Sequence, residues 1–126
     1  ALVGIGSTDP ELYSLLRAGY VSSDELEYIR SRGAVGDICA QHYDANGQWL
    51  NIGINRRVIG ITLGTLKHIP TVVGVAGDAR KAETILAALR GGHINVLITD
   101  DTAARAVLDR YAALQKAAPA VAEEAA

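Results

Sequence analysis

The sequence predicts an α/β fold, namely an open, mostly parallel β-sheet with helices on both faces and one antiparallel hairpin. Two observations predict it. Short, almost uninterrupted apolar runs, typical of strands covered on both faces, alternate with segments whose apolar residues recur at helical spacing. Within residues 71–98, a strand, a helix of about a dozen residues and a second strand follow so closely that a right-handed parallel crossover is expected. The expected arrangement is Rossmann-like, and in such sheets ligands bind where the strands end.

The first part of the chain is predicted to contain one strand and two short helices. Residues 1–6 are mostly apolar and read as a strand. Pro10 in the first helical position, after a potential cap at Asp9, opens a short helix. Ser22 and Glu25 form a capping box that opens a second helix. Both helices carry leucine or isoleucine at helical spacing, so we interpret them as structural.

The middle of the chain predicts a hairpin, a strand and a short helix. The dipeptide Asn46-Gly47 between two β-prone arms indicates an antiparallel hairpin from about Ile38 to Asn51. Val58 to Ile61 predicts a further strand. Thr62 is a suitable cap for the short helix that follows.

The last part of the chain contains the crossover and a final helix. Its strands are expected from Thr71 to Ala76 and from Ile94 to Ile98. Asp101 or Thr102 is expected to cap the final helix. Residues 117–126 have low complexity and include a proline, so we expect a disordered tail.

Composition narrows the functional classes. The chain has 126 residues, 49% hydrophobic and 21% charged, which suits one domain with a real core. A net charge of −2 argues against DNA binding by this segment itself. Without a long apolar run or a signal-like start, we expect a cytoplasmic protein with no membrane contact. The single Cys39 reads as a buried small residue, and three widely spaced histidines predict neither a metal site nor a metal cofactor.

The carboxyl end of the first crossover strand is the first candidate site. Gly77 turns the chain there, and Asp78 can cap the next helix. Arg80 and Lys81 then fall in the opening turn, where the helix dipole disfavours basic residues. A bound anion would reverse that sign, and a glycine turn with a lysine at a helix start can cradle a phosphate. The alternative is that Asp78 and Glu83 neutralise both bases on a solvated surface.

Asp37 is the second candidate, because it lies inside an otherwise apolar run just after Gly36. A carboxylate in such a setting must find a partner. It either bonds to neighbouring backbone or accepts hydrogen bonds from the hydroxyls of a polyol or sugar. Asp100, at the end of the second crossover strand, is likewise either a capping residue or a ligand contact.

Several segments occur in a specific order: GAVGDI, the turn DANG, RVIGITL with KHIP, VVGVAG, KAETILAALRGG and INVLITDDTAA. This series resembles the effector-binding domain of SorC-type (SorC/DeoR) transcriptional regulators. That family pairs an N-terminal helix-turn-helix DNA-binding region with a sugar-binding domain similar in fold to sugar-phosphate isomerases. The resemblance implies that residues 1–116 are the C-terminal portion of such a domain, and that the DNA-binding region is not in this chain.

By this resemblance, Lys81 matches the family's lysine near the ligand phosphate, and Asp37 matches the acidic residue that contacts the sugar. Together with Gly36, Gly77 and Asp100, these residues form the predicted effector site. Asp78 departs from the family, because many members carry a glycine there; Ala40 also replaces a common glycine.

The resemblance therefore predicts a non-enzymatic effector sensor that binds a sugar or sugar phosphate without a cofactor. Operator DNA would be a partner only through the missing N-terminal region. We also expect a homo-oligomer, because a partial domain leaves sheet edge and apolar surface uncovered.

Two other classes remain open. An isomerase-like enzyme would need a positioned acid and base, and only Asp37 and Asp100 could serve. A nucleotide-binding module would need a GxGxxG motif, but Asp9 stands where the third glycine belongs after Gly4 and Gly6.

Overall fold

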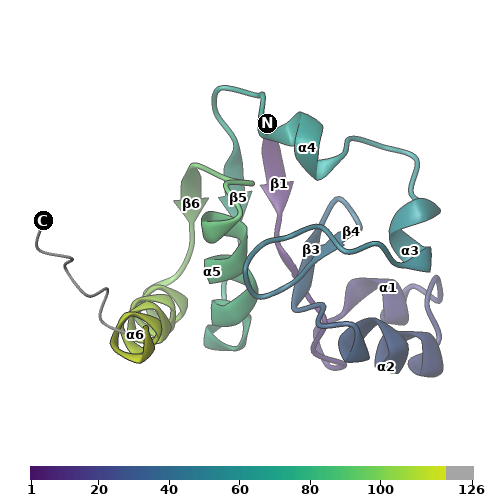
Figure 1. The fold of residues 1–126 in the computed structure, drawn as a ribbon, viewed down its shortest axis with the longest axis horizontal. Coiled ribbons are helices and arrows are strands. Elements are labelled where there is room, and N and C mark those ends of the chain that lie inside the picture. Colours follow the sequence, from purple (N-terminus) through teal and green to yellow (C-terminus); the bar gives the residue numbers. More distant parts are fainter. Residues whose placement is uncertain (119–126) are drawn as a thin grey trace, which may run out of the picture.

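The computed structural model describes residues 1–118 and contains two three-stranded sheets (Figure 1). In the parallel sheet, β5 (Val73–Val75) lies between β1 (Leu2–Gly4) and β6 (Val96–Ile98). In the antiparallel sheet, β3 (Gly36–Ile38) lies between β2 (Gly6–Ser7) and β4 (Gln41–Tyr43). The α/β prediction is confirmed, including the parallel pairing of the two crossover strands.

The helices of the described residues are mostly short. Their bounds are α1 (Ser14–Arg17), α2 (Ser23–Ser31), α3 (Gly53–Arg56), α4 (Leu63–Leu66), the 3₁₀ helix η1 (Ala79–Lys81), α5 (Ala82–Arg90) and α6 (Asp101–Ala117). The predicted caps Ser22 and Thr62 are confirmed, because each side chain accepts a hydrogen bond from the third residue after it. The cap of α6 is Asp100 rather than Asp101 or Thr102.

Two apolar cores hold these elements together. Only Ile5 separates β1 from β2, so the two sheets meet at this residue, which is buried. The larger core joins Ile5 to buried residues of α4, α5 and α6. The smaller core joins Tyr13 to buried residues of α2 and α3. The chain thus forms two packed regions whose junction is the start of β2.

One face of the parallel sheet is open. Residues paired in register share a face, so Leu2, Val75, Val96 and Ile98 point the same way, and they are 73%, 41%, 43% and 55% exposed. Val3 and Leu97, on the opposite face, pack against the larger core. Within residues 1–118, therefore, only one face of this sheet is covered, whereas the sequence predicted helices on both faces.

Two local predictions are wrong. Residues 58–61 form no strand: Ile59 is fully exposed, and α3, which the sequence analysis missed, precedes this segment. A β-prone run needs a neighbouring strand, and none lies beside it in the described structure. The predicted helix at Pro10 is only a turn, in which the Asp9 carboxylate accepts from the Glu11 N–H at 2.9 Å, and α1 starts later.

The hairpin prediction is partly wrong. The turn at residues 44–47 exists, but its return arm contributes only one isolated bridge, Tyr43 to Trp49. The paired hairpin is β3–β4, and its two-residue turn consists of Cys39 and Ala40 with φ angles of 52° and 61°. Such turns favour glycine or asparagine, and because neither is present here, the sequence did not predict this turn. Cys39 is also exposed, contrary to prediction.

Helix α6 runs to Ala117, whereas most of the predicted tail, residues 119–126, lies outside the described residues.

Candidate functional site

A hollow of about 510 Å³ opens where the two sheets meet. Its floor includes the β1–β2 connection, and one wall is the segment Leu12–Arg17 around α1. The turn at Cys39 and Ala40 forms another wall. Asp37 and Lys81, two predicted site residues, both line this hollow although they lie on different elements.

Asp37 is buried in β3, with only 8% of its surface exposed. Its Oδ2 accepts from the Ala40 N–H at 3.2 Å, whereas Oδ1 is buried and has no hydrogen-bond partner in the described structure. Gly6 lies opposite in β2, where a Cβ atom would collide with Oδ1. Burial raises the pKa of Asp37, although His42, the Ala40 N–H and Lys81 oppose this rise. Among the described residues, Oδ1 is therefore an unsatisfied acceptor on a side chain that lines the hollow.

Lys81 ends η1 and precedes the nine-residue helix α5. Its Nζ donates to the Ile5 carbonyl at 3.0 Å, which fixes the ammonium group beside the sheet junction. An ammonium group has three donors, so two remain for a ligand. No salt bridge joins Lys81 to a carboxylate within residues 1–118.

Arg80, in contrast, is neutralised by carboxylates on the surface, which is the alternative that the sequence left open for both bases. Its guanidinium group forms salt bridges with Asp78 at 2.7 Å and Glu11 at 3.0 Å. The Arg80 hydrogen bonds are the main reason why the pKa of Asp78 is lowered. Glu83 pairs with Arg110, not with Lys81. Of the two neighbouring bases, only Lys81 therefore keeps its charge available to the hollow.

Gly36 lies behind the hollow rather than on its surface. A Cβ atom there would collide with the Thr84 hydroxyl and the Gly6 carbonyl. The same Thr84 hydroxyl donates to the Gly6 carbonyl at 2.8 Å. Gly36 thus lets β3 approach α5 closely, which places Asp37, the next residue, over Gly6.

Gly77 and Asp100 form a separate cluster that joins the ends of β5 and β6. Asp100 Oδ2 accepts from the Asp78 N–H at 2.7 Å, and Oδ1 accepts from the Ala103 N–H and the Thr102 hydroxyl, each at 2.7 Å. These bonds, the Ala103 N–H first, lower the pKa of Asp100 to about 2. A Cβ at Gly77 would lie only 2.5 Å from Oδ2. Neither residue lines the hollow.

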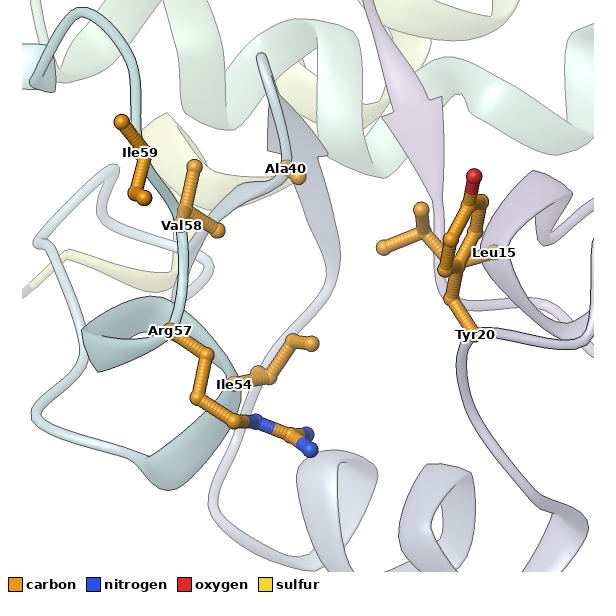
Figure 2. A pocket seen from close by; sticks show the side chains of 7 residues that line it. All are labelled: Leu15, Tyr20, Ala40, Ile54, Arg57, Val58 and Ile59. Atoms are coloured by element: carbon orange, nitrogen blue, oxygen red, sulfur yellow. The ribbon is translucent and has the colours of Figure 1, made fainter.

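A second hollow, of about 470 Å³, also reaches the Cys39–Ala40 turn, at Ala40 (Figure 2). Leu15 and Tyr20 lie on one side of it, and Val58 and Ile59 lie on the opposite side. Arg57 also lines it, but its guanidinium group is paired with Glu25. Leu15 and Ala40 line both hollows, so the two are neighbours.

The described residues contain no group of three His, Cys, Asp or Glu side chains that could hold a metal ion. In the same residues, no helix combines the length and the apolar character needed to span a membrane.

Comparison with known proteins gives consistent matches. The model of a family described as "putative sugar-binding domain" matches residues 1–109. The transcriptional regulator LsrR of Enterobacter sp. (strain 638) is 46% identical over 110 residues, which make up 86% of this chain and 34% of that protein. The chain thus spans about a third of the length of such relatives.

Solved structures agree. A domain of a transcriptional repressor from Vibrio fischeri, described as a "putative sugar-binding domain", has a TM-score of 0.77 at 37% identity, covering 87% of this chain and 44% of that one. The full-length sorbitol operon regulator SorC from Klebsiella pneumoniae has a TM-score of 0.75 at 33% identity, covering 85% of this chain and 34% of that one.

Proposed function

Because this chain belongs to the family described as a putative sugar-binding domain, we propose that it is the effector-sensing part of a bacterial transcriptional regulator. Its effector would be a sugar or sugar phosphate bound in the hollow of Asp37 and Lys81. The observation that carries this proposal concerns residues 1–118: one hollow combines a buried carboxylate oxygen without a hydrogen-bond partner and an ammonium group without a salt bridge there.

The chemistry of the two groups matches such an effector. Asp37 Oδ1 can only accept while the carboxylate is ionised, so it suits a sugar hydroxyl. Lys81 offers two donors and a positive charge, which suit a phosphate group. Gly4, which lines the hollow just before the β1–β2 connection, has no Cβ atom, so the carbon chain of a ligand can approach the backbone closely there.

Asp100 and Gly77 contribute indirectly under this proposal. In the described structure, the Asp100 carboxylate accepts from its own turn and from the Asp78 N–H, so it fixes the approach to η1 and thereby the position of Lys81. Gly36 likewise contributes indirectly, because it fixes the position of Asp37.

The regulator explains the site better than the two alternatives. For an isomerase-like enzyme, Asp37 and Asp100 were the candidate acid and base, but Asp100 belongs to the other cluster, and the relatives are named as transcriptional regulators. A nucleotide-binding module lacks its glycine motif, and Asp9 instead closes a turn.

Operator DNA would be contacted by a region outside this chain, since the chain carries a net charge of −2. A regulator of this kind would act in the cytoplasm. We also infer a homo-oligomer, because the open face of the parallel sheet presents apolar side chains to solvent.

A ligand panel tests the proposal. We would measure the melting temperature of the full-length protein with ribose 5-phosphate, glucose 6-phosphate, fructose 6-phosphate and sorbitol 6-phosphate, and with each unphosphorylated parent. Stabilisation by one of these without turnover is expected, because a ligand that binds only the folded state raises its stability. Turnover would support the enzyme, and stabilisation by NAD alone would support the nucleotide-binding module.

A further inference from the structure

His42 is a fully buried residue of β4 that the proposed function leaves without a role. It lies directly opposite Asp37 of β3, so both side chains project from the same face of the antiparallel sheet. Its ring contacts two segments that are distant in the sequence. Nε2 lies 2.7 Å from the Tyr13 hydroxyl, and Nδ1 lies 2.9 Å from Asn55 Oδ1.

The surrounding bonds assign the protons of this group. The Asn55 amide nitrogen donates to the carbonyls of His42 and Leu50, at 2.9 and 2.8 Å, so Asn55 Oδ1 is the acceptor. That oxygen accepts from the His42 backbone N–H at 2.7 Å, and hence also from a protonated Nδ1. Nε2 then accepts from the Tyr13 hydroxyl, which stays protonated because burial raises the pKa of Tyr13.

This group of three residues holds one wall of the effector hollow. Tyr13 is fully buried, while its neighbours Leu12, Ser14, Leu15 and Arg17 line the hollow. Helix α1 has four residues and no side-chain cap, so tertiary contacts must set its position. Within residues 1–118 the hydroxyl of Tyr13 makes one hydrogen bond, to His42, and the two rings meet edge to face with centroids 5.7 Å apart.

We propose that His42 is a positioning residue of the effector site, which holds the Leu12–Arg17 wall opposite Asp37 through Tyr13 and is itself oriented by Asn55. The proposal rests on the proposed function of the hollow. His42 does not line the hollow, so it acts on a bound sugar or sugar phosphate only through the wall that it fixes.

The test compares two buried tyrosine hydroxyls. Tyr13→Phe removes the bond to His42 and keeps the ring. Tyr43→Phe is the matched control, because the Tyr43 hydroxyl is equally buried and bonds to Thr84 at 2.8 Å, on α5 rather than on the Leu12–Arg17 wall. Calorimetric titration of the full-length protein would use whichever of the four sugar phosphates named above raises the melting temperature most.

Both variants are expected to lower the melting temperature by similar amounts. Only Tyr13→Phe should weaken the sugar phosphate, by about tenfold. His42→Asn, which keeps a donor for Asn55 but cannot reach Tyr13, should give the same loss. In the double variant with Tyr13→Phe the two losses should not add, because they remove one bond.

Equal affinity changes in Tyr13→Phe and Tyr43→Phe, or none in either, would overturn the proposal. If Tyr13→Phe does not fold, His42→Asn decides in its place. Asp37→Asn distinguishes a failure of the proposed function from a failure of the proposed role of His42. Unchanged affinity in that variant would defeat the proposed function itself, whereas a large loss there with none in Tyr13→Phe and His42→Asn would defeat only the role of His42.

Discussion

The two sheets of this chain differ in what covers them and in what they carry. Every residue of β3 and β4 is buried, yet three of the six are polar: Asp37, Gln41 and His42. The strands of the parallel sheet consist of apolar residues and glycine, yet leave one face exposed. The polar strands are thus the better covered ones.

The difference teaches where specificity resides. Buried polar groups must be matched by partners in fixed directions, so the antiparallel sheet permits little change in sequence or position. Its single unmatched oxygen, Asp37 Oδ1, stands out as the place where a ligand completes the pattern. Lys81 is held by the carbonyl of Ile5, between the two sheets, and the strands of the parallel sheet contain no charged residue.

The largest expected effect on stability appears in a comparison of two glycines, one in each sheet and each close to the hollow. Gly36→Ala should lower the free energy of unfolding by about 3 kcal/mol, because a Cβ there collides with Thr84 and with backbone. Gly4→Ala should change it by less than about 1 kcal/mol, because no heavy atom lies within 4 Å of a Cβ there. Urea denaturation of both variants measures the contrast, and equal losses would show that the two sheets are packed alike.

A smaller effect is expected from Asp37→Asn, which should stabilise the unliganded fold by about 1 kcal/mol at pH 7 while weakening the sugar phosphate. The physical reason is that burial raises the pKa of Asp37, so its ionised form costs stability. That cost is complete above the folded-state pKa and disappears as the pH falls to the unfolded value of about 3.9. The difference in melting temperature between variant and wild type should therefore shrink on acidification. A variant that is less stable than wild type at pH 7 would contradict this explanation.

The smallest effect on stability is expected at the open face. The double change Val96→Thr and Ile98→Thr should alter the free energy of unfolding of the isolated chain by only about 1 kcal/mol or less, because both side chains are about half exposed. Sedimentation should nevertheless show less self-association than in the wild type. If the wild-type chain sediments as a monomer at every concentration, the inferred oligomer does not use this face.

The sequence predicted the parallel unit well and the antiparallel unit poorly, for a physical reason. Residues 71–98 combine local signals, namely apolar runs, a cap and glycine stops, that agree with their tertiary setting. The β3–β4 turn at Cys39 and Ala40 has no favourable local residue, so only its long-range contacts specify it.

The candidate site shows the same division. Asp37 and Lys81 could be selected because each conflicts with its local setting, one as a charge in an apolar run and the other as a base at a helix start. Their meeting in one hollow depends on the chain passing from one sheet to the other at Ile5, which no local pattern reveals. The partnership of Tyr13, His42 and Asn55 spans 42 positions for the same reason and was missed.

The most direct test of the central claim is calorimetric titration of the full-length protein with Lys81→Ala and its neighbour Arg80→Ala as the matched control. The titrants are the bound sugar phosphate and its unphosphorylated parent. Lys81→Ala should weaken the phosphorylated sugar by about ten- to a hundredfold and the parent much less, because it removes a charged hydrogen bond. Arg80→Ala should leave both affinities unchanged, since Asp78 and Glu11 already neutralise Arg80. Equal losses for both titrants in Lys81→Ala, or no loss for either, would contradict the claim that Lys81 binds the phosphate.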